Sequence, residues 1–106
     1  MKAADRAGVR LDFLSRQCSA VVSLNLAKFC IDWKLIGRRI GLTEADLAAI
    51  DGNNRTVEEK RVGMLEKWRS MFAYEAIYQT LIEALLAEGR NAEAIEMCKV
   101  INAAEG

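Results

Sequence analysis

The chain of 106 residues has no histidine, no proline and only three cysteines. Without histidine it has no imidazole to act as a general base, to bind zinc or to titrate near neutral pH. Cys18, Cys30 and Cys98 are widely and irregularly spaced, which favours reduced, mostly buried thiols over a disulfide framework. The absence of proline, together with abundant Ala, Leu and Glu, predicts helices throughout.

Net charge and long apolar runs are absent as well. Fifteen basic and fifteen acidic residues cancel, so no overall field attracts nucleic acid or an anionic membrane. No apolar run approaches the roughly 20 residues that a membrane-spanning helix needs. Asp5 and Arg6 interrupt the region where a secretory signal would have its apolar segment. We therefore expect a cytoplasmic protein without nucleic-acid binding and without membrane insertion.

Catalysis has little support in the sequence. The carboxylates of Glu58 and Glu59 are adjacent on a predicted helix and do not converge on one point. Glu44 and Asp46 are accounted for by the preference of acidic residues for the N-terminus of a helix. A cysteine nucleophile would lack its usual histidine base. We expect no enzyme activity, no catalytic or metal-binding residue, no cofactor and no small-molecule substrate.

Apolar residues recur at three- and four-residue spacing along the whole chain, which predicts an all-α fold of six short helices. Residues 1–8 are expected to be flexible, and residues 9–104 to form one domain. The first periodic region is either one long helix or two consecutive helices with a break near residues 19–25. Its apolar positions are Leu11, Leu14, Cys18, Val22, Leu26 and Phe29.

Capping residues mark the starts of the next helices. Asp32 can cap the second helix, and Gly41 supplies its left-handed exit. Thr43 then opens a third helix as a capping box, and a Thr-x-x-Glu box at residues 56–59 opens a fourth after a loop at residues 52–54.

Two further helices complete the prediction. The fifth covers residues 74–88 and ends at Gly89, and Asn91 caps the sixth. The residues that we expect in the structural core are Trp33, Ile36, Ile40, Leu47, Leu65, Trp68, Leu81, Leu85 and Ile95.

Residues 33–101 resemble a death domain in the order and spacing of their motifs. The matching pieces are residues 33–47 (WKLIGRRIGLTEADL), Glu59 to Trp68, 76–85 and 92–95. The resemblance implies a six-helix antiparallel bundle that binds other death-domain proteins, or copies of itself, in signalling complexes such as those of apoptosis. Leu35 departs from the family, whose members often have a polar residue there. Gly63 inside the fourth helix is a second departure, which lowers helix propensity or permits a close helix contact.

Charges separate between the second and third predicted helices. The residues that we expect to contact a partner are Lys34, Leu35, Arg38 and Arg39 on one helix, with Glu44, Asp46 and Asp51 on the next. Opposed patches permit head-to-tail association, although an ordinary salt-bridged surface accounts for the same charges. Leu35 is either the apolar centre of this surface or additional core.

Two other functions fit parts of the sequence. Residues 74–101 also resemble the helix pair of a tetratricopeptide repeat, which would make the chain a peptide-binding fragment, but no second copy follows at a 34-residue period. A DNA-binding helix-turn-helix at residues 33–50 would present Glu44 and Asp46 to phosphates, which disfavours it.

Overall fold

The computed structural model describes residues 12–105, and this part of the chain contains six α-helices and no β-sheet. The predicted flexible segment at residues 1–8 lies outside the described residues. None of the described helices is long and apolar enough to cross a bilayer. The helices are α2 (Ala20–Leu26), α3 (Trp33–Arg39), α4 (Glu44–Asn53), α5 (Val57–Phe72), α6 (Tyr78–Ala87) and α7 (Asn91–Glu105).

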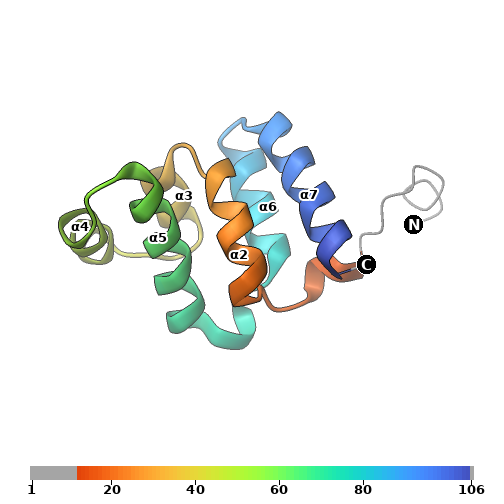
Figure 1. Cartoon of the computed structure of the whole chain (residues 1–106), viewed down its shortest axis with the longest axis horizontal. Coiled ribbons are helices and arrows are strands. Elements are labelled where there is room, and N and C mark those ends of the chain that lie inside the picture. The colour runs from red at the N-terminus through yellow and green to blue at the C-terminus, as the bar shows by residue number, and fades with distance from the viewer. Residues whose placement is uncertain (1–11, 106) are drawn as a thin grey trace.

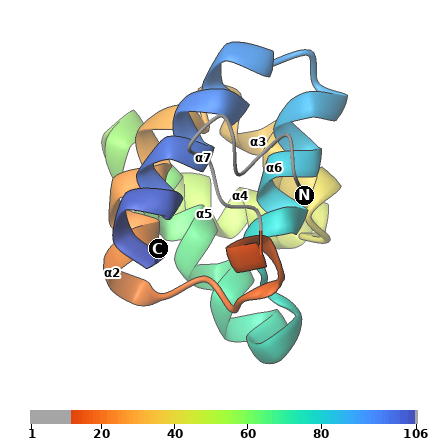
Figure 2. The same cartoon turned by 90° about the vertical axis from the view of Figure 1, so that its right-hand side faces the viewer.

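The helices form a bundle, and different helices make up its two ends. Helices α3 and α4 pack with α5 at one end, and α6 and α7 pack on each other toward the opposite end (Figure 1). Helix α2 contacts both α5 and α7. In the perpendicular view α2 and α6 lie on opposite sides of the bundle, with α7 between them (Figure 2).

The core lies where these helices meet, and both tryptophans belong to it. The buried residues include Trp33, Ile36, Ile40, Leu47, Leu65, Trp68, Leu81 and Leu85. Ile95 is 56% exposed, so the prediction that it belongs to the core is wrong. Helix α7 buries Ala94, Met97 and Ile101 instead. Ile95 directly follows Ala94, so its side chain lies about 100° around the helix from the buried Ala94.

The first periodic region is two separate elements rather than one helix. A 3-10 helix at Asp12–Ser15 is followed by an extended segment, and α2 then begins after Ser19, whose hydroxyl accepts a hydrogen bond from the Val22 amide at 3.2 Å. The break therefore lies at residues 16–19, before the expected position. A second 3-10 helix, Ala27–Phe29, continues α2. The predicted inward position Leu11 lies outside the described residues.

The capping boxes form as the sequence predicts, but Asp32 does not act as a cap. Thr43 and Thr56 each accept a hydrogen bond from the backbone amide three residues on and are capped in return by that residue's carboxylate. The carboxylate of Asp32 makes no capping hydrogen bond and pairs with Arg90 instead. Helix α4 also continues through the predicted loop at Gly52 as far as Asn53.

Helix α6 starts at Tyr78, four residues later than predicted. A 3-10 helix, Ala73–Glu75, precedes it, and Ile77 is extended because it forms a β-bridge with Gln17. Ala73 has φ 49° and ψ −109°, a region that favours glycine. Helix α6 ends at Ala87, one residue before the predicted end, and Gly89, with φ 75°, is its left-handed exit as predicted. Helix α7 begins at Asn91 itself rather than after it.

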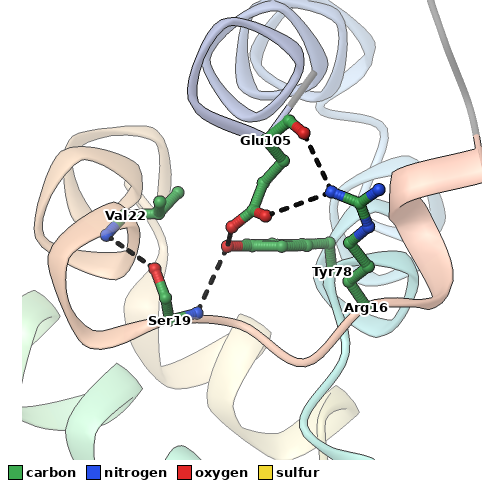
Figure 3. Close-up of polar contacts among 5 residues, drawn as sticks. All are labelled: Arg16, Ser19, Val22, Tyr78 and Glu105. Atoms are coloured by element: carbon green, nitrogen blue, oxygen red, sulfur yellow. Dashed lines mark hydrogen bonds and ion pairs between the residues drawn. The ribbon is translucent and has the colours of Figure 1, made fainter.

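A hydrogen-bond network around the buried Tyr78 ties three segments together (Figure 3). The Tyr78 hydroxyl accepts from the Ser19 amide at 3.2 Å and donates to the Glu105 carboxylate at 2.7 Å. Arg16 donates to the Glu105 carbonyl at 2.8 Å. Burial raises the pKa of Tyr78, which therefore stays a neutral donor. This set, the Tyr78 network, joins the segment before α2 to α6 and to the end of α7.

Candidate functional site

A tight turn holds α3 against α4 and so brings their outer faces together. A Cβ on Gly37 would lie 2.7 Å from a Leu47 methyl group, so the glycine permits the close approach of the two helices. Gly41 has φ 108° and directs the chain into α4. A Cβ there would lie 2.7 Å from the Phe72 ring, so this turn also packs against the end of α5.

The outer faces of α3 and α4 enclose an open hollow of about 400 Å³. Residues at four- and three-residue spacing on each helix line it, because such positions share one helix face. The lining residues are Lys34, Arg38, Glu44, Leu47, Ala48, Asp51 and Gly52. The hollow thus has basic groups on the α3 side and carboxylates on the α4 side.

The two predicted charge patches pair with each other within the chain. Arg38 forms a two-pronged ion pair with Glu44, one branch of which measures 3.1 Å from Nη2 to Oε1. Lys34 lies 3.0 Å from Asp51, which also accepts from Lys60 at 2.7 Å. The patches are therefore neighbours on one molecule rather than separate opposed surfaces.

These contacts favour the charged forms of the carboxylates. The hydrogen bond from Arg38 lowers the pKa of Glu44, and hydrogen bonds from Lys60 and then Lys34 lower the pKa of Asp51. Both side chains stay open to solvent. Exposed ion pairs of this kind contribute little to folding, because water competes for both partners.

Two of the charged residues that we expect to contact a partner, Arg39 and Asp46, do not line the hollow, and neither does Leu35. Arg39 pairs with Glu88 at the end of α6, so its side chain turns away from α4. Asp46 caps α4 by accepting from the Thr43 amide at 3.0 Å, and this hydrogen bond lowers its pKa. It lines a different hollow, beside Gly63 of α5.

Leu35 is 42% exposed in the structure. It follows Lys34 and precedes Arg38 by three residues, so it lies beside the charges that line the hollow. Helix α3 buries Trp33, Ile36 and Gly37 instead. We name Lys34, Leu35, Arg38, Glu44 and Asp51 the α3–α4 face.

Sequence reasoning missed two partners of the predicted contact residues. Lys60 on α5 forms a second ion pair with Asp51, and Glu88 forms an ion pair with Arg39. Helix spacing reveals pairs three or four residues apart, whereas Arg39 and Glu88 are 49 residues apart. Only the packing of α3 against α6 brings these two residues together.

Cysteine reactivity and metal binding have no support in the described residues. All three cysteines are free, and burial raises the pKa of Cys18 and of Cys30 to about 12. Burial also raises the pKa of Cys98. Such thiols are weak nucleophiles at neutral pH. Residues 12–105 contain no cluster of three or more His, Cys, Asp or Glu side chains that could hold a metal ion.

A family model for the death domain matches residues 22–99, which is more than half of the chain. The chain belongs to the death-domain family. A comparison with curated proteins gives no match, so this membership rests on the family model and agrees with the six described α-helices. Death domains are protein-interaction modules.

The family match also decides between the competing functions of the α6–α7 pair. Both helices lie within the matched region as part of the death domain, so the tetratricopeptide alternative gains no support. The match begins at residue 22, after Arg16 and Ser19, and it ends before Glu105. Three of the four residues of the Tyr78 network therefore lie outside the matched part of this death domain.

Proposed function

We propose that this death domain is a non-enzymatic cytoplasmic module that binds other death domains through its α3–α4 face and so helps to assemble a signalling complex. The observation that carries the proposal is the exposure of Leu35 beside a charged hollow of about 400 Å³. An apolar centre with a polar rim is typical of protein interfaces.

The ion pairs within the face are compatible with this role. Arg38 and Glu44 are both solvent-exposed, so exchanging their contact for one with a partner loses little folding free energy. A partner that presents its own charges can replace each internal pair by an intermolecular one. Such exchange favours selection of the correct partner and fast association more than raw affinity.

Arg38→Glu tests the proposal by calorimetric titration against a panel of purified death domains, including this one. Binding of at least one member by the unchanged chain, weakened about tenfold or more by the substitution, is the expected result. Thermal unfolding should be nearly unchanged, because Arg38 contributes to an exposed pair only.

Lys99→Glu is the matched control, since Lys99 forms an exposed pair with Glu96 on α7, away from this face. It should bind like the unchanged chain. The double variant Arg38→Glu with Glu44→Arg restores an internal pair in reversed orientation and should still bind poorly. Equal binding by the folded Arg38→Glu variant would remove the α3–α4 face from the proposal.

A further inference from the structure

The two tyrosines of the chain are close in sequence but have opposite surroundings. Tyr78 is fully buried, and its hydroxyl is hydrogen-bonded to Ser19 and Glu105. Tyr74 is 86% exposed, the largest exposure of any large apolar side chain within residues 12–105. A ring that lies almost wholly in solvent contributes little to packing. The fold therefore does not require the Tyr74 side chain, which is free to meet another protein.

Tyr74 lies in a short turn rather than in an α-helix. It is the middle residue of the 3-10 helix Ala73–Glu75, which lies between α5 and α6 at the lower edge of the bundle in Figure 1. All three residues of this turn are exposed. Ala73 has φ 49°, and such strain lowers the free energy needed to open the turn locally. An enzyme cleft can therefore admit the ring together with the neighbouring backbone.

The residues that follow Tyr74 have the chemistry that phosphotyrosine recognition uses. Residues 74–77 (YEAI) have a carboxylate directly after the tyrosine and a branched apolar side chain three residues after it. Domains that bind phosphotyrosine in an extended peptide hold the phosphate with arginine and place a later side chain in an apolar pocket. Glu75 is exposed, and the Ile77 backbone is already extended, with φ −102° and ψ 156°.

The position of Ile77 in the fold depends on few contacts. It pairs with Gln17 in an isolated β-bridge, beside which two backbone hydrogen bonds measure 2.7 and 3.2 Å. The Ile77 side chain is half-buried, whereas Ala76 is fully buried. A domain that binds residues 74–77 as an extended peptide must therefore release this bridge. Such local opening costs less free energy than unfolding of the whole domain.

We propose that Tyr74 is a phosphorylation site for a tyrosine kinase and that the phosphorylated turn binds a phosphotyrosine-recognition domain. In the reaction the Tyr74 phenol oxygen forms a bond to the γ-phosphorus of ATP, and the bond from that phosphorus to the β-phosphate oxygen breaks. ADP leaves, and the phenol proton passes to the catalytic aspartate of the kinase. The product has about 1.5 to 2 additional negative charges beside Glu75. Tyr74 does not belong to the α3–α4 face, so this modification does not require the proposed function.

The surroundings of the two tyrosines select Tyr74 as the acceptor. Water can hydrate a phosphate on the exposed Tyr74 ring, so the modification buries no charge. A phosphate on Tyr78 would instead lie in the core against the Glu105 carboxylate, to which the hydroxyl now donates. The folded chain should therefore accept one phosphate, at Tyr74, with its thermal unfolding nearly unchanged.

A kinase reaction on the folded chain tests the first step. The chain is incubated with ATP, Mg²⁺ and a purified tyrosine kinase that prefers acidic substrates, and mass spectrometry locates the phosphate. We expect one phosphate per chain at Tyr74 and none in Tyr74→Phe, which still contains Tyr78. Glu75→Lys should slow the reaction about tenfold or more, because it reverses the charge that this kinase selects. Arg38→Glu, on the α3–α4 face, should react like the unchanged chain.

Calorimetric titration of the phosphorylated chain tests the second step. The probe is a purified phosphotyrosine-recognition domain that selects isoleucine three residues after the phosphotyrosine. It should bind the phosphorylated chain about a hundredfold or more tightly than the unphosphorylated chain. Ile77→Thr should be phosphorylated normally but bind about tenfold more weakly, because it places a hydroxyl in the apolar pocket. Met71→Ala, at an exposed position before the turn, is the matched control and should bind like the unchanged chain.

Each step can fail separately. A folded chain that the kinase leaves unmodified, although it phosphorylates a peptide of residues 70–77, would overturn the site. Phosphorylation of Tyr78 as fast as Tyr74 would overturn it as well. A phosphorylated chain that the recognition domain does not bind, although it binds the phosphorylated peptide, would show that the bridge keeps Ile77 in the fold and would overturn the second step.

Discussion

The two ends of this death domain use polar groups in opposite ways. At the α3–α4 end, ion pairs such as Arg38–Glu44 lie in solvent on the outer face. At the other end, the buried Tyr78 hydroxyl joins the segment before α2 to the end of α7 through two hydrogen bonds. Water competes for exposed pairs, whereas a buried group that loses its partner has no replacement. The exposed pairs of the first end therefore contribute little to folding, whereas the buried hydroxyl of the second end helps to hold the fold.

Substitution of a core residue should cause the largest loss of stability, with which the effects at the two ends can be compared. Trp68 is 1% exposed on α5, and Trp68→Ala should lower the free energy of unfolding by about 3–5 kcal/mol because it leaves a large cavity. Met71→Ala on the exposed side of the same helix is the matched control and should have a much smaller effect. Urea denaturation measures both. A Trp68→Ala variant as stable as Met71→Ala would contradict the described core.

Tyr78→Phe tests how much the buried Tyr78 hydroxyl contributes to the stability of the fold. It removes one hydroxyl and leaves the Ser19 amide and the Glu105 carboxylate without this partner, which should lower the free energy of unfolding by about 1–3 kcal/mol. Tyr74→Phe is the control, since Tyr74 is 86% exposed and should tolerate the same change. Equal unfolding midpoints for the two variants would remove the distinction between the ends.

The junction of α5 and α6 offers a stabilising substitution. Ala73 has φ 49°, where an L side chain is strained, so Ala73→Gly should raise the free energy of unfolding by about 1 kcal/mol. The greater freedom of glycine in the unfolded chain opposes part of this gain. Gly52→Ala, in open space within α4, separates the two effects because it adds helix propensity without relieving strain. A destabilised Ala73→Gly would show that the turn is relaxed in solution.

The smallest expected effect is at the exposed α3–α4 end, where acid titration measures the pKa of Glu44. Because the folded-state pKa of Glu44 is lowered, its contribution to stability is present above the unfolded pKa and is lost as the pH falls through the folded value. Arg38→Gln should return the pKa of Glu44 toward its ordinary value. Carboxylate NMR detects this, with Asp51 as the internal reference. An unchanged Glu44 titration would mean that the ion pair is not formed in solution.

Local signals in the sequence account for most of the fold, and long-range contacts account for the errors. Thr43 and Thr56 have capping partners three residues away, so their helices start where predicted. The start of α6 depends on a bridge between Gln17 and Ile77, and residues so far apart leave no periodic signal. Ile95 has the apolar character of a core residue, yet its angular position on α7 places it in solvent.

The candidate site shows the same limit. The sequence predicts which residues of α3 and α4 carry charge, and the structure shows that Lys34 and Asp51 pair with each other. The orientation of Arg39 toward Glu88 depends on how α3 packs against α6. Spacing along one helix can therefore group residues on a face, but it cannot identify the partner that each side chain meets.

Leu35→Ser tests most directly whether the α3–α4 face serves binding rather than folding. Calorimetric binding to a death domain recognised by the unchanged chain and thermal unfolding are measured on the same sample. We expect at least a tenfold loss of affinity, about 1.4 kcal/mol, with a loss of no more than about 1 kcal/mol in folding free energy. A folded variant that binds normally but has lost about 3 kcal/mol of stability would show that Leu35 belongs to the core and does not bind a partner.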